Sequence, residues 1–277
     1  MRYLIYILGS LFFWSCEQTV YPNPDYRLVF VDEFQSENID ETVWNFEIGT
    51  GCQYGVNLDG WGNFEEQYYK AENASIVDND YLQIEAKEEL VTFTHCDGNV
   101  QTRAYSSARI NTKTKYDFTY GKVEASIKMD VKNGAWHAFW MLPSYPQSNW
   151  PDSGELDIVE LASKQNSILF AGTMHHSGPQ LGSTISYGND LSFFDDFHLY
   201  TLEWDLSSVK WYIDNELFYS VNRSANSTLD ANWPFDTEFH LILNTAIGGT
   251  LGGQPEFNGQ SQYMLVDYIK VYQKLSE

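Results

Sequence analysis

Basic residues and internal linkers are scarce in this 277-residue chain. It has 16 Lys and Arg residues against 38 Asp and Glu residues, which gives a formal charge of −22. So acidic a surface repels nucleic acid and anionic membranes, and we expect neither as a direct partner. From residue 26 onward there is no repeat or low-complexity stretch, so residues 26–277 are predicted to form one domain and the protein to be a monomer.

The N-terminal apolar run is too short to cross a membrane. It covers residues 3–14, follows Arg2 and ends at Ser15 and Cys16. A spanning helix needs about 20 apolar residues, so residues 1–15 are predicted to be a cleaved signal peptide. The small residue before Cys16 resembles a lipoprotein box, which predicts a lipidated Cys16, a tether over residues 17–25 and a lipid anchor in the outer membrane or at the cell surface. The alternative is an ordinary signal and a periplasmic or extracellular protein.

Two further cysteines follow Cys16. Cys52 and Cys96 both lie in segments rich in Gly, Asn or Asp, which are typical of loops. Export to an oxidising compartment would permit a disulfide between them, and the sequence leaves this pairing and two free thiols equally open. A metal site that includes His95 is less favoured.

Short segments rich in Val, Ile, Tyr, Phe and Trp recur between turn signals, and no long window has a helical stripe. Many alternate, as residues 121–129 do, so that every second side chain can face a core. This pattern predicts an all-β fold, an antiparallel β-sandwich or jelly roll, with hairpin turns such as Asp214-Asn215. The predicted strands cover residues 28–30, 81–86, 107–112, 121–129, 135–142, 155–161, 169–175, 197–204, 209–213, 239–245 and 264–273.

Aromatic residues are abundant, with nine Trp and nineteen Tyr. Their flat apolar faces and polar edges suit the C–H faces and hydroxyl rims of sugar rings, so some of them are expected to form a ligand surface. For any single aromatic side chain, packing in the core of a large sandwich is the alternative.

Three carboxylates interrupt an apolar segment at residues 150–161. Glu155 and Asp157 share one face of a strand, whereas Glu160 has the opposite parity. A bulge near Ile158-Val159 is therefore predicted, because it would turn Glu160 to the side of the other two acids. An acidic surface strand is the alternative.

Catalysis would explain such a repulsive group. Retaining glycosidases need one ionised carboxylate and one protonated carboxyl group about 5–5.5 Å apart. The charge of Glu155 and partial burial would raise the pKa of Glu160 and keep it protonated, and Asp157 could orient Glu155 by a hydrogen bond.

The run Glu155-Leu156-Asp157-Ile158-Val159-Glu160 resembles the bulged active-site pattern of glycoside hydrolase family 16, and within it the laminarinase-like β-1,3-glucanases. The resemblance extends over about residues 28–273. It implies a concanavalin A-like fold with a concave substrate cleft, with Glu155 as nucleophile, Glu160 as acid/base and Asp157 as the assisting residue.

Further segments resemble the family in the same order, at residues 60–69, 107–110, 134–143 and 172–175. Together with the acidic segment, which Trp150 precedes, they imply sugar contacts by Trp61, Asn63, Arg109, Trp136, Trp140, Trp150 and His175. For Arg109 a structural ion pair is the alternative, and for the tryptophans and His175 it is core packing. The adjacent His176 has the opposite parity, so a metal site with two histidines is not expected.

Three departures from the family pattern leave the glycan open. His137 stands where proline is usual, residues 161–163 lack the usual aromatic and glycine, and residues 250–253 lack a tryptophan. We expect all three to line or border the cleft.

The resemblance also implies a structural calcium, held by Glu33, the backbone of Asp80 and Asp267. Hard oxygen ligands suit calcium, but three scattered acids are a weak signal in so acidic a protein. No cofactor is expected to take part in the chemistry.

The sequence as a whole predicts an exported, retaining endo-glycosidase acting on β-1,3-glucan such as laminarin. The alternatives are the same mechanism on mixed-linkage β-glucan or a red-algal galactan, and a non-catalytic glycan-binding lipoprotein.

Overall fold

The structure is a computed structural model that describes residues 25–164, 167–188, 190–223 and 233–275. The predicted signal peptide, Cys16 and all but the last residue of the predicted tether lie outside these ranges. None of the described helices is both long and apolar enough to span a membrane.

Two sheets form the molecule, and the strands within each are antiparallel except for one parallel pair, β3 with β6, among the described residues. The larger sheet runs β16-β15-β14-β9-β18-β5-β6-β3, with β1 on β18 and β4 on β5. Its strands are β1 (Tyr26–Asp32), β3 (Gln67–Tyr69), β4 (Ala74–Val77), β5 (Tyr81–Thr94), β6 (Val100–Ser107), β9 (Gly121–Met129), β14 (His198–Trp204), β15 (Ser208–Ile213), β16 (Glu216–Asn222) and β18 (Gln262–Lys274).

The eight-stranded sheet runs β13-β12-β11-β10-β17-β7-β2, with β8 on β17. Its strands are β2 (Asn45–Phe46), β7 (Arg109–Asn111), β8 (Asp117–Phe118), β10 (Ala135–Pro143), β11 (Glu155–Lys164), β12 (Ser167–His175), β13 (Leu181–Ser186) and β17 (Phe239–Ile247). The described helices are all short: η1 (Cys52–Tyr54), η2 (Val56–Gly62), η3 (Ala71–Asn73), η4 (Ser192–Asp195) and α2 (Gly249–Gly252).

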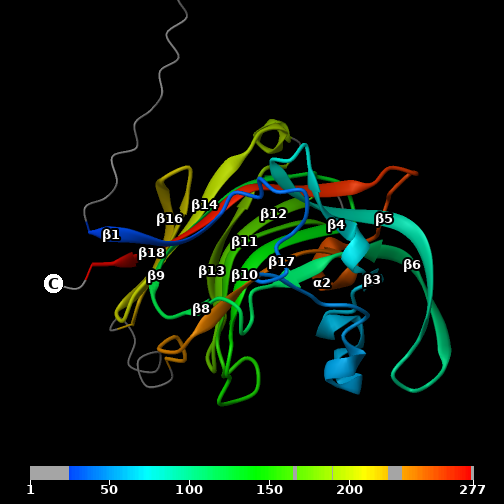
Figure 1. The fold of residues 1–277 in the computed structure, drawn as a ribbon, viewed down its shortest axis with the longest axis horizontal. Coiled ribbons are helices and arrows are strands. Elements are labelled where there is room, and N and C mark those ends of the chain that lie inside the picture. Colours follow the sequence, from blue (N-terminus) through cyan, green and yellow to red (C-terminus); the bar gives the residue numbers. More distant parts are fainter. Residues whose placement is uncertain (1–24, 165–166, 189, 224–232, 276–277) are drawn as a thin grey trace, which may run out of the picture.

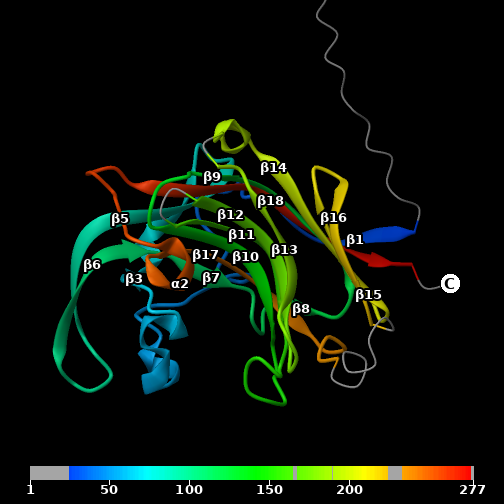
Figure 2. The ribbon, with the colours of Figure 1, turned by 180° about the vertical axis from the view of Figure 1, so that it is seen from behind.

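One apolar core lies between the two sheets. It includes Ile127 of β9 and Leu202 of β14 from the larger sheet, and Phe139 of β10 and Leu156 of β11 from the smaller one. Alternation along the strands leaves the other face of the eight-stranded sheet free of this core, and we call that face the site face. Figures 1 and 2 show the β5–β6 hairpin projecting from one side of the sandwich, opposite the C-terminus.

The predicted sandwich is confirmed, and the strand boundaries differ mostly by a few residues. Strand β9 coincides with the predicted strand, and Asp214 and Asn215 both have positive φ values, 50° and 69°, as a tight hairpin turn between β15 and β16 requires. The strands that were not predicted are β2, β3, β4, β8, β13, β16 and all of β6 but its last residue. In β6, residues 101–103 are polar, and residues 100–105 alternate between exposed and half-buried positions.

Candidate active site

The predicted bulge in β11 is confirmed. The register between β11 and β12 shifts between Asp157 and Glu160, and Ile158 and Val159 both lie in the core. Two consecutive residues on one face change the parity of the strand. Glu160 therefore lies on the site face together with Glu155 and Asp157.

A separate hydrogen-bond donor contacts each acid. The indole N–H of Trp150 donates to Glu155 Oε2 at 3.0 Å, and that of Trp136 donates to Glu160 Oε1 at 2.9 Å. Thr173 Oγ1 donates to Asp157 Oδ2, which strand β12 places directly opposite. The donors come from β10, β12 and the loop before β11, so three segments fix the acids in place.

His175 joins two members of the group. Its Nε2 lies 3.4 Å from Glu155 Oε1 and 3.3 Å from Asp157 Oδ2. The ring also packs against Trp150, with the ring centroids 5.5 Å apart. The predicted position of His175 beside the acids is thus what the structure shows, whereas His176 is buried and accepts a hydrogen bond from the Gly178 N–H.

Burial and mutual repulsion shift the acidity of this group. Burial is the larger cause that raises the pKa of Glu160 to about 8, followed by the charge of Asp157. Burial and the charges of Asp157 and Glu160 raise the pKa of Glu155 as well, against the opposing hydrogen bond from Trp150. Among the described residues, no Lys or Arg forms an ion pair with any of the three acids.

Such a group holds a proton at neutral pH on at least one of its members. Trp150 and the more distant Arg109 favour the charged form of Glu155, and no arginine lowers the pKa of Glu160. One ionised and one protonated carboxyl group on the same face are what double displacement at an acetal carbon requires.

Beside the acids, an arginine is sandwiched between two tryptophans. The Arg109 guanidinium carbon lies 4.5 Å from the ring centroid of Trp61 and 4.8 Å from that of Trp140. Its Nε donates to Glu47, and both side chains are largely buried. The structural ion pair that we considered for Arg109 is therefore present, together with two cation–π contacts.

Four residues around this stack were not singled out by sequence analysis: Glu47, Glu65, Tyr69 and Asn244. Glu65 and Tyr69 lie in the segment of residues 60–69 that resembles the family. Their closeness in sequence to Asn63 was the available signal. Strand pairing across β10, β17 and β7 brings Asn244 beside Trp140 and Arg109. Only this pairing shows that residues so distant in sequence form one polar network.

The tryptophans of the site face differ in exposure. Trp150 is 58% exposed, although its ring contacts His175. Trp136 is only 8% exposed, because it packs against Ala162, Ala246 and Leu251. The packing alternative thus describes most of the Trp136 ring, and its polar contact with the site is the N–H bound to Glu160.

His137 does not border the site face, contrary to expectation. The side chain is fully buried, with Nδ1 2.8 Å from Thr245 Oγ1 and Nε2 2.8 Å from the Asp130 carbonyl oxygen. It has the parity of Phe139 and Met141, which both lie in the core. This departure from the family pattern therefore affects packing and is not a contact with the glycan.

Cys52 and Cys96 form a disulfide, with their Cα atoms 6.1 Å apart. The bridge ties η1 to the tip of the β5–β6 hairpin, and an ion pair between Asp59 of η2 and Arg103 of β6 joins the adjacent helix to the same hairpin. The loop that contains Trp61 and Asn63 is thereby attached to the hairpin. His95, which lies 3.6 Å from Asp59, has no thiolate partner for a metal ion because Cys52 is oxidised.

The residues predicted to hold calcium do not form a cluster of side chains. Glu33 lies 3.4 Å from Lys270 Nζ, and Asp80 accepts a hydrogen bond from Gln35. Among the described residues, two groups of metal-ligating side chains occur, and neither includes Glu33, Asp80 or Asp267. The calcium stays a prediction, since backbone oxygens would have to complete the site.

Comparisons with known proteins give a consistent result. Residues 64–270 match the sequence model of the family described as "Glycosyl hydrolases family 16". The chain is 34% identical over 267 residues to a "Beta-glucanase" from Rhodothermus marinus, an alignment that covers 90% of this chain and 86% of the relative.

Solved structures of the same kind superpose on this one. The laminarinase catalytic domain from Thermotoga maritima MSB8 matches with a TM-score of 0.81 and 37% identity, covering 91% of this chain and 100% of that one. LamA from Z. galactanivorans, solved in complex with laminaritriose and laminaritetraose, matches with a TM-score of 0.72 and 33% identity, covering 89% and 98%.

Proposed function

Because the chain belongs to glycosyl hydrolase family 16, a family of retaining glycosidases, we propose that it is an endo-acting hydrolase of β-1,3-glucan such as laminarin. The observation that supports the site is the bulge at Ile158-Val159, which assembles Glu155, Asp157 and Glu160 on one face. The names of the similar proteins support the substrate class, since a laminarinase and a complex with laminari-oligosaccharides are among them.

In the proposed mechanism, a Glu155 oxygen attacks the anomeric carbon while Glu160 gives its proton to the leaving oxygen. A glycosyl-enzyme bonded to Glu155 forms, and the reducing-end fragment departs. Glu160, now ionised, takes a proton from water, which attacks the same carbon and releases Glu155. Each of the two steps inverts the anomeric carbon, so the product retains the anomeric configuration of the substrate.

Neighbouring side chains have distinct tasks in this scheme. The Trp150 N–H stabilises the charge on Glu155 before attack. Asp157 is held by Thr173 and contacts His175, and it thereby fixes the position of the His175 ring beside Glu155. The exposed ring of Trp150 can also stack on a sugar next to the nucleophile.

A polysaccharide panel read by reducing-end release tests the proposal. We expect cleavage of laminarin in preference to lichenan, agarose and porphyran, with Glu155→Gln inactive on all four. Preference for lichenan would reassign the enzyme to mixed-linkage glucan, and preference for agarose or porphyran to a galactan. Binding without release of reducing ends by the unaltered protein would show a glycan-binding protein and refute the proposal.

We further propose that the protein is exported as a lipoprotein through Cys16, on the basis of the N-terminal sequence. Labelling with a fatty-acid analogue during expression, compared between the natural chain and Cys16→Ser, tests this. Incorporation that is unaffected by the substitution would contradict it.

A further inference from the structure

We propose that Glu65 is a positioning residue that orients both Asn63 and Trp140, and this rests on the proposed function. Glu65 follows Asn63 by two residues and is 5% exposed. It touches none of the three acids in β11 through any hydrogen bond or ion pair among the described residues. Its influence is therefore expected on substrate binding and not on bond cleavage.

Hydrogen-bond donors converge on the Glu65 carboxylate. Gln67 Nε2 donates to Oε2 at 2.6 Å, Tyr69 O–H donates to the same oxygen at 3.0 Å, and Asn63 Nδ2 approaches Oε1 at 3.5 Å. Burial raises the pKa of Glu65, whereas Arg109 and these donors oppose that shift. A group that only accepts hydrogen bonds suits this setting, as an ionised carboxylate does.

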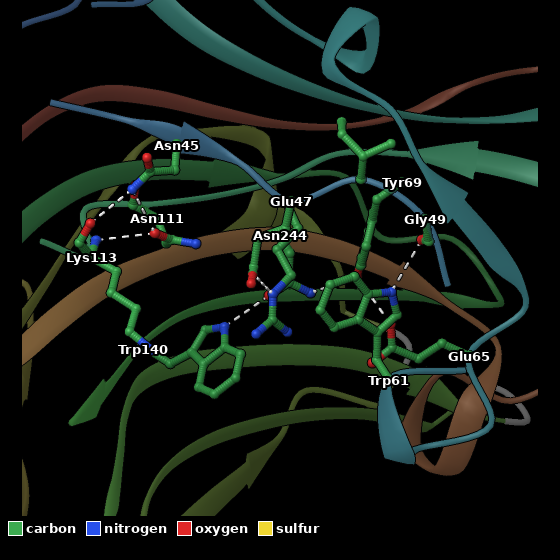
Figure 3. Close-up of polar contacts among 12 residues, drawn as sticks. Asn45, Glu47, Gly49, Trp61, Glu65, Tyr69, Asn111, Lys113, Trp140 and Asn244 are labelled. Atoms are coloured by element: carbon green, nitrogen blue, oxygen red, sulfur yellow. Dashed lines mark hydrogen bonds and ion pairs between the residues drawn. The ribbon is translucent and has the colours of Figure 1, made fainter. Parts of the chain in front are cut away.

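The direction of each hydrogen bond follows from residues that have a single option. An indole N–H can only donate, so Trp140 Nε1 donates to Asn244 Oδ1 at 2.8 Å. The amide of Asn244 must then present its Nδ2 to the Tyr69 hydroxyl oxygen at 3.1 Å, which leaves the Tyr69 proton for Glu65 (Figure 3). The relay from Trp140 to Glu65 thus has one consistent arrangement of donors.

The other end of the carboxylate is fixed in the same way. The Ile247 N–H donates to Gln67 Oε1 at 2.7 Å, so the Gln67 amide must turn its Nε2 to Glu65. The Asn63 carbonyl oxygen accepts the Thr250 N–H at 3.0 Å, which holds the loop against α2. Glu65 therefore contacts Asn63 directly and is connected to the Trp140 indole through Tyr69 and Asn244.

Orientation of Trp140 matters because its ring also contacts Arg109. A tilted indole would separate from the guanidinium at 4.8 Å and disturb the stack with Trp61. Tyr69 supports Trp61 directly as well, with ring centroids 5.3 Å apart. One buried carboxylate thus orients Asn63 directly and Trp140 through Tyr69 and Asn244, and both are side chains that the family resemblance implies for sugar contact.

Tyr69→Phe breaks the relay and keeps the ring that packs on Trp61. We expect KM for the cleaved glycan to rise about fivefold, as for a lost hydrogen bond that held a binding group, with kcat changed less than about twofold. Tyr272→Phe is the matched control, because the Tyr272 hydroxyl also donates to a glutamate, Glu124, at 2.8 Å, but in the larger sheet. Tyr272→Phe should leave KM unchanged.

Glu65→Gln tests the second arm. Oε2 of Glu65 accepts two hydrogen bonds, so the oxygen of a Gln amide would take that place and its N–H₂ group would face the Asn63 Nδ2 donor. The Asn63 side chain must then turn away or flip. We expect a KM increase at least as large as that of Tyr69→Phe, whereas Glu65→Asp should restore part of the affinity. Equal KM values for natural protein, Glu65→Gln and Tyr69→Phe would overturn the proposal, as would an equal KM increase in Tyr272→Phe.

A readout without substrate separates this proposal from the proposed function. The NMR resonance of the Trp140 indole N–H, assigned by its loss in Trp140→Phe, should shift in Tyr69→Phe and stay in place in Tyr272→Phe. An unshifted resonance refutes the positioning role even if the protein is a glucanase. If no glycan is cleaved but the resonance shifts, the proposed function fails and the positioning of Trp140 stands.

Discussion

Two groups of largely buried acids differ in their counter-charges: Glu155, Asp157 and Glu160 in β11, and Glu47 and Glu65 in the loops after β2 and before β3. Glu155, Asp157 and Glu160 form no ion pair with Lys or Arg among the described residues, whereas Glu47 is bound directly by Arg109, which also faces Glu65. In the first group burial raises the pKa of Glu160 to about 8; in the second, Arg109 lowers the pKa of Glu47 despite burial, whereas at Glu65 burial outweighs the charge of Arg109 and raises the pKa. Without a cation, the first group keeps a protonated carboxyl group that can serve as a proton donor. Arg109 makes the second group part of the structural framework.

The comparison has an energetic consequence. Repulsion within the first group opposes folding, so removing one acid relieves it. Removing the cation from the second group leaves the buried Glu47 carboxylate without its counter-charge, which is strongly destabilising. Substitution of an acid in the first group should therefore lower activity without lowering stability. Removal of the cation from the second group should lower stability.

Glu160→Gln should have the largest effect on activity. Loss of the proton donor is expected to lower kcat/KM on the cleaved glycan by about 10²–10⁴-fold, while the unfolding temperature is unchanged or higher, because folding no longer has to protonate a carboxyl group that is ionised in the unfolded chain at pH 7. Reducing-end assays and thermal unfolding at pH 7 measure both. A marked fall in unfolding temperature would mean that the acids support the fold, and the contrast between the two groups would be lost.

Arg109→Met should have the largest effect on stability. Glu47 would stay buried without a counter-charge, and we expect a loss of about 3–5 kcal/mol in the free energy of unfolding, measured by urea denaturation. Arg103→Met is the control, because the Arg103–Asp59 pair is partly exposed and should contribute less than about 1 kcal/mol. Equal losses in the two variants would contradict the assignment of Arg109 as the buried counter-charge.

The pH dependence should follow the raised pKa of Glu160. Activity needs its protonated form, so kcat/KM is expected to fall about tenfold per pH unit above pH 8. A carboxyl group whose pKa is higher in the folded state stabilises the fold fully below about pH 4.5, and this contribution is lost as the pH rises through about 8. The free energy of unfolding of the natural protein should therefore decline over this range relative to Glu160→Gln. Parallel stability curves would contradict this linkage.

A pair of tryptophan substitutions gives the smallest and most specific test. The hydrogen bond from the Trp136 N–H lowers the pKa of Glu160. Trp136→Phe removes this N–H and should raise that pKa, so the alkaline limit of activity should move upward by a few tenths of a pH unit up to about one unit. Trp140→Phe removes the N–H bonded to Asn244 and should raise KM without moving that limit. A shift of the pH profile in Trp140→Phe instead would show that the two groups are electrostatically coupled.

Much of the fold and of the catalytic group could be predicted from local patterns. Alternating residues 121–129 predicted β9, and the unusual parity of Glu160 predicted the bulge that the register of β11 confirms. These predictions succeed because parity and strand period are properties of a few consecutive residues. The family pattern, and not parity, led us to expect His137 at the cleft, and this expectation is wrong. His137 shares the parity of Phe139 and is buried on the core side of β10.

The sequence by itself determined the all-β fold, the three acids and their shared face. Only the tertiary structure decided which cation is near which acid, since Arg109 meets Glu47 across β2 and β7, and Asn244 joins Trp140 to Tyr69 across three segments. The physical reason is that a charge acts through space on whatever folding brings within a few ångströms, and residues 109 and 244 are brought together by strand pairing. The sequence separation of two residues carries no information about that distance.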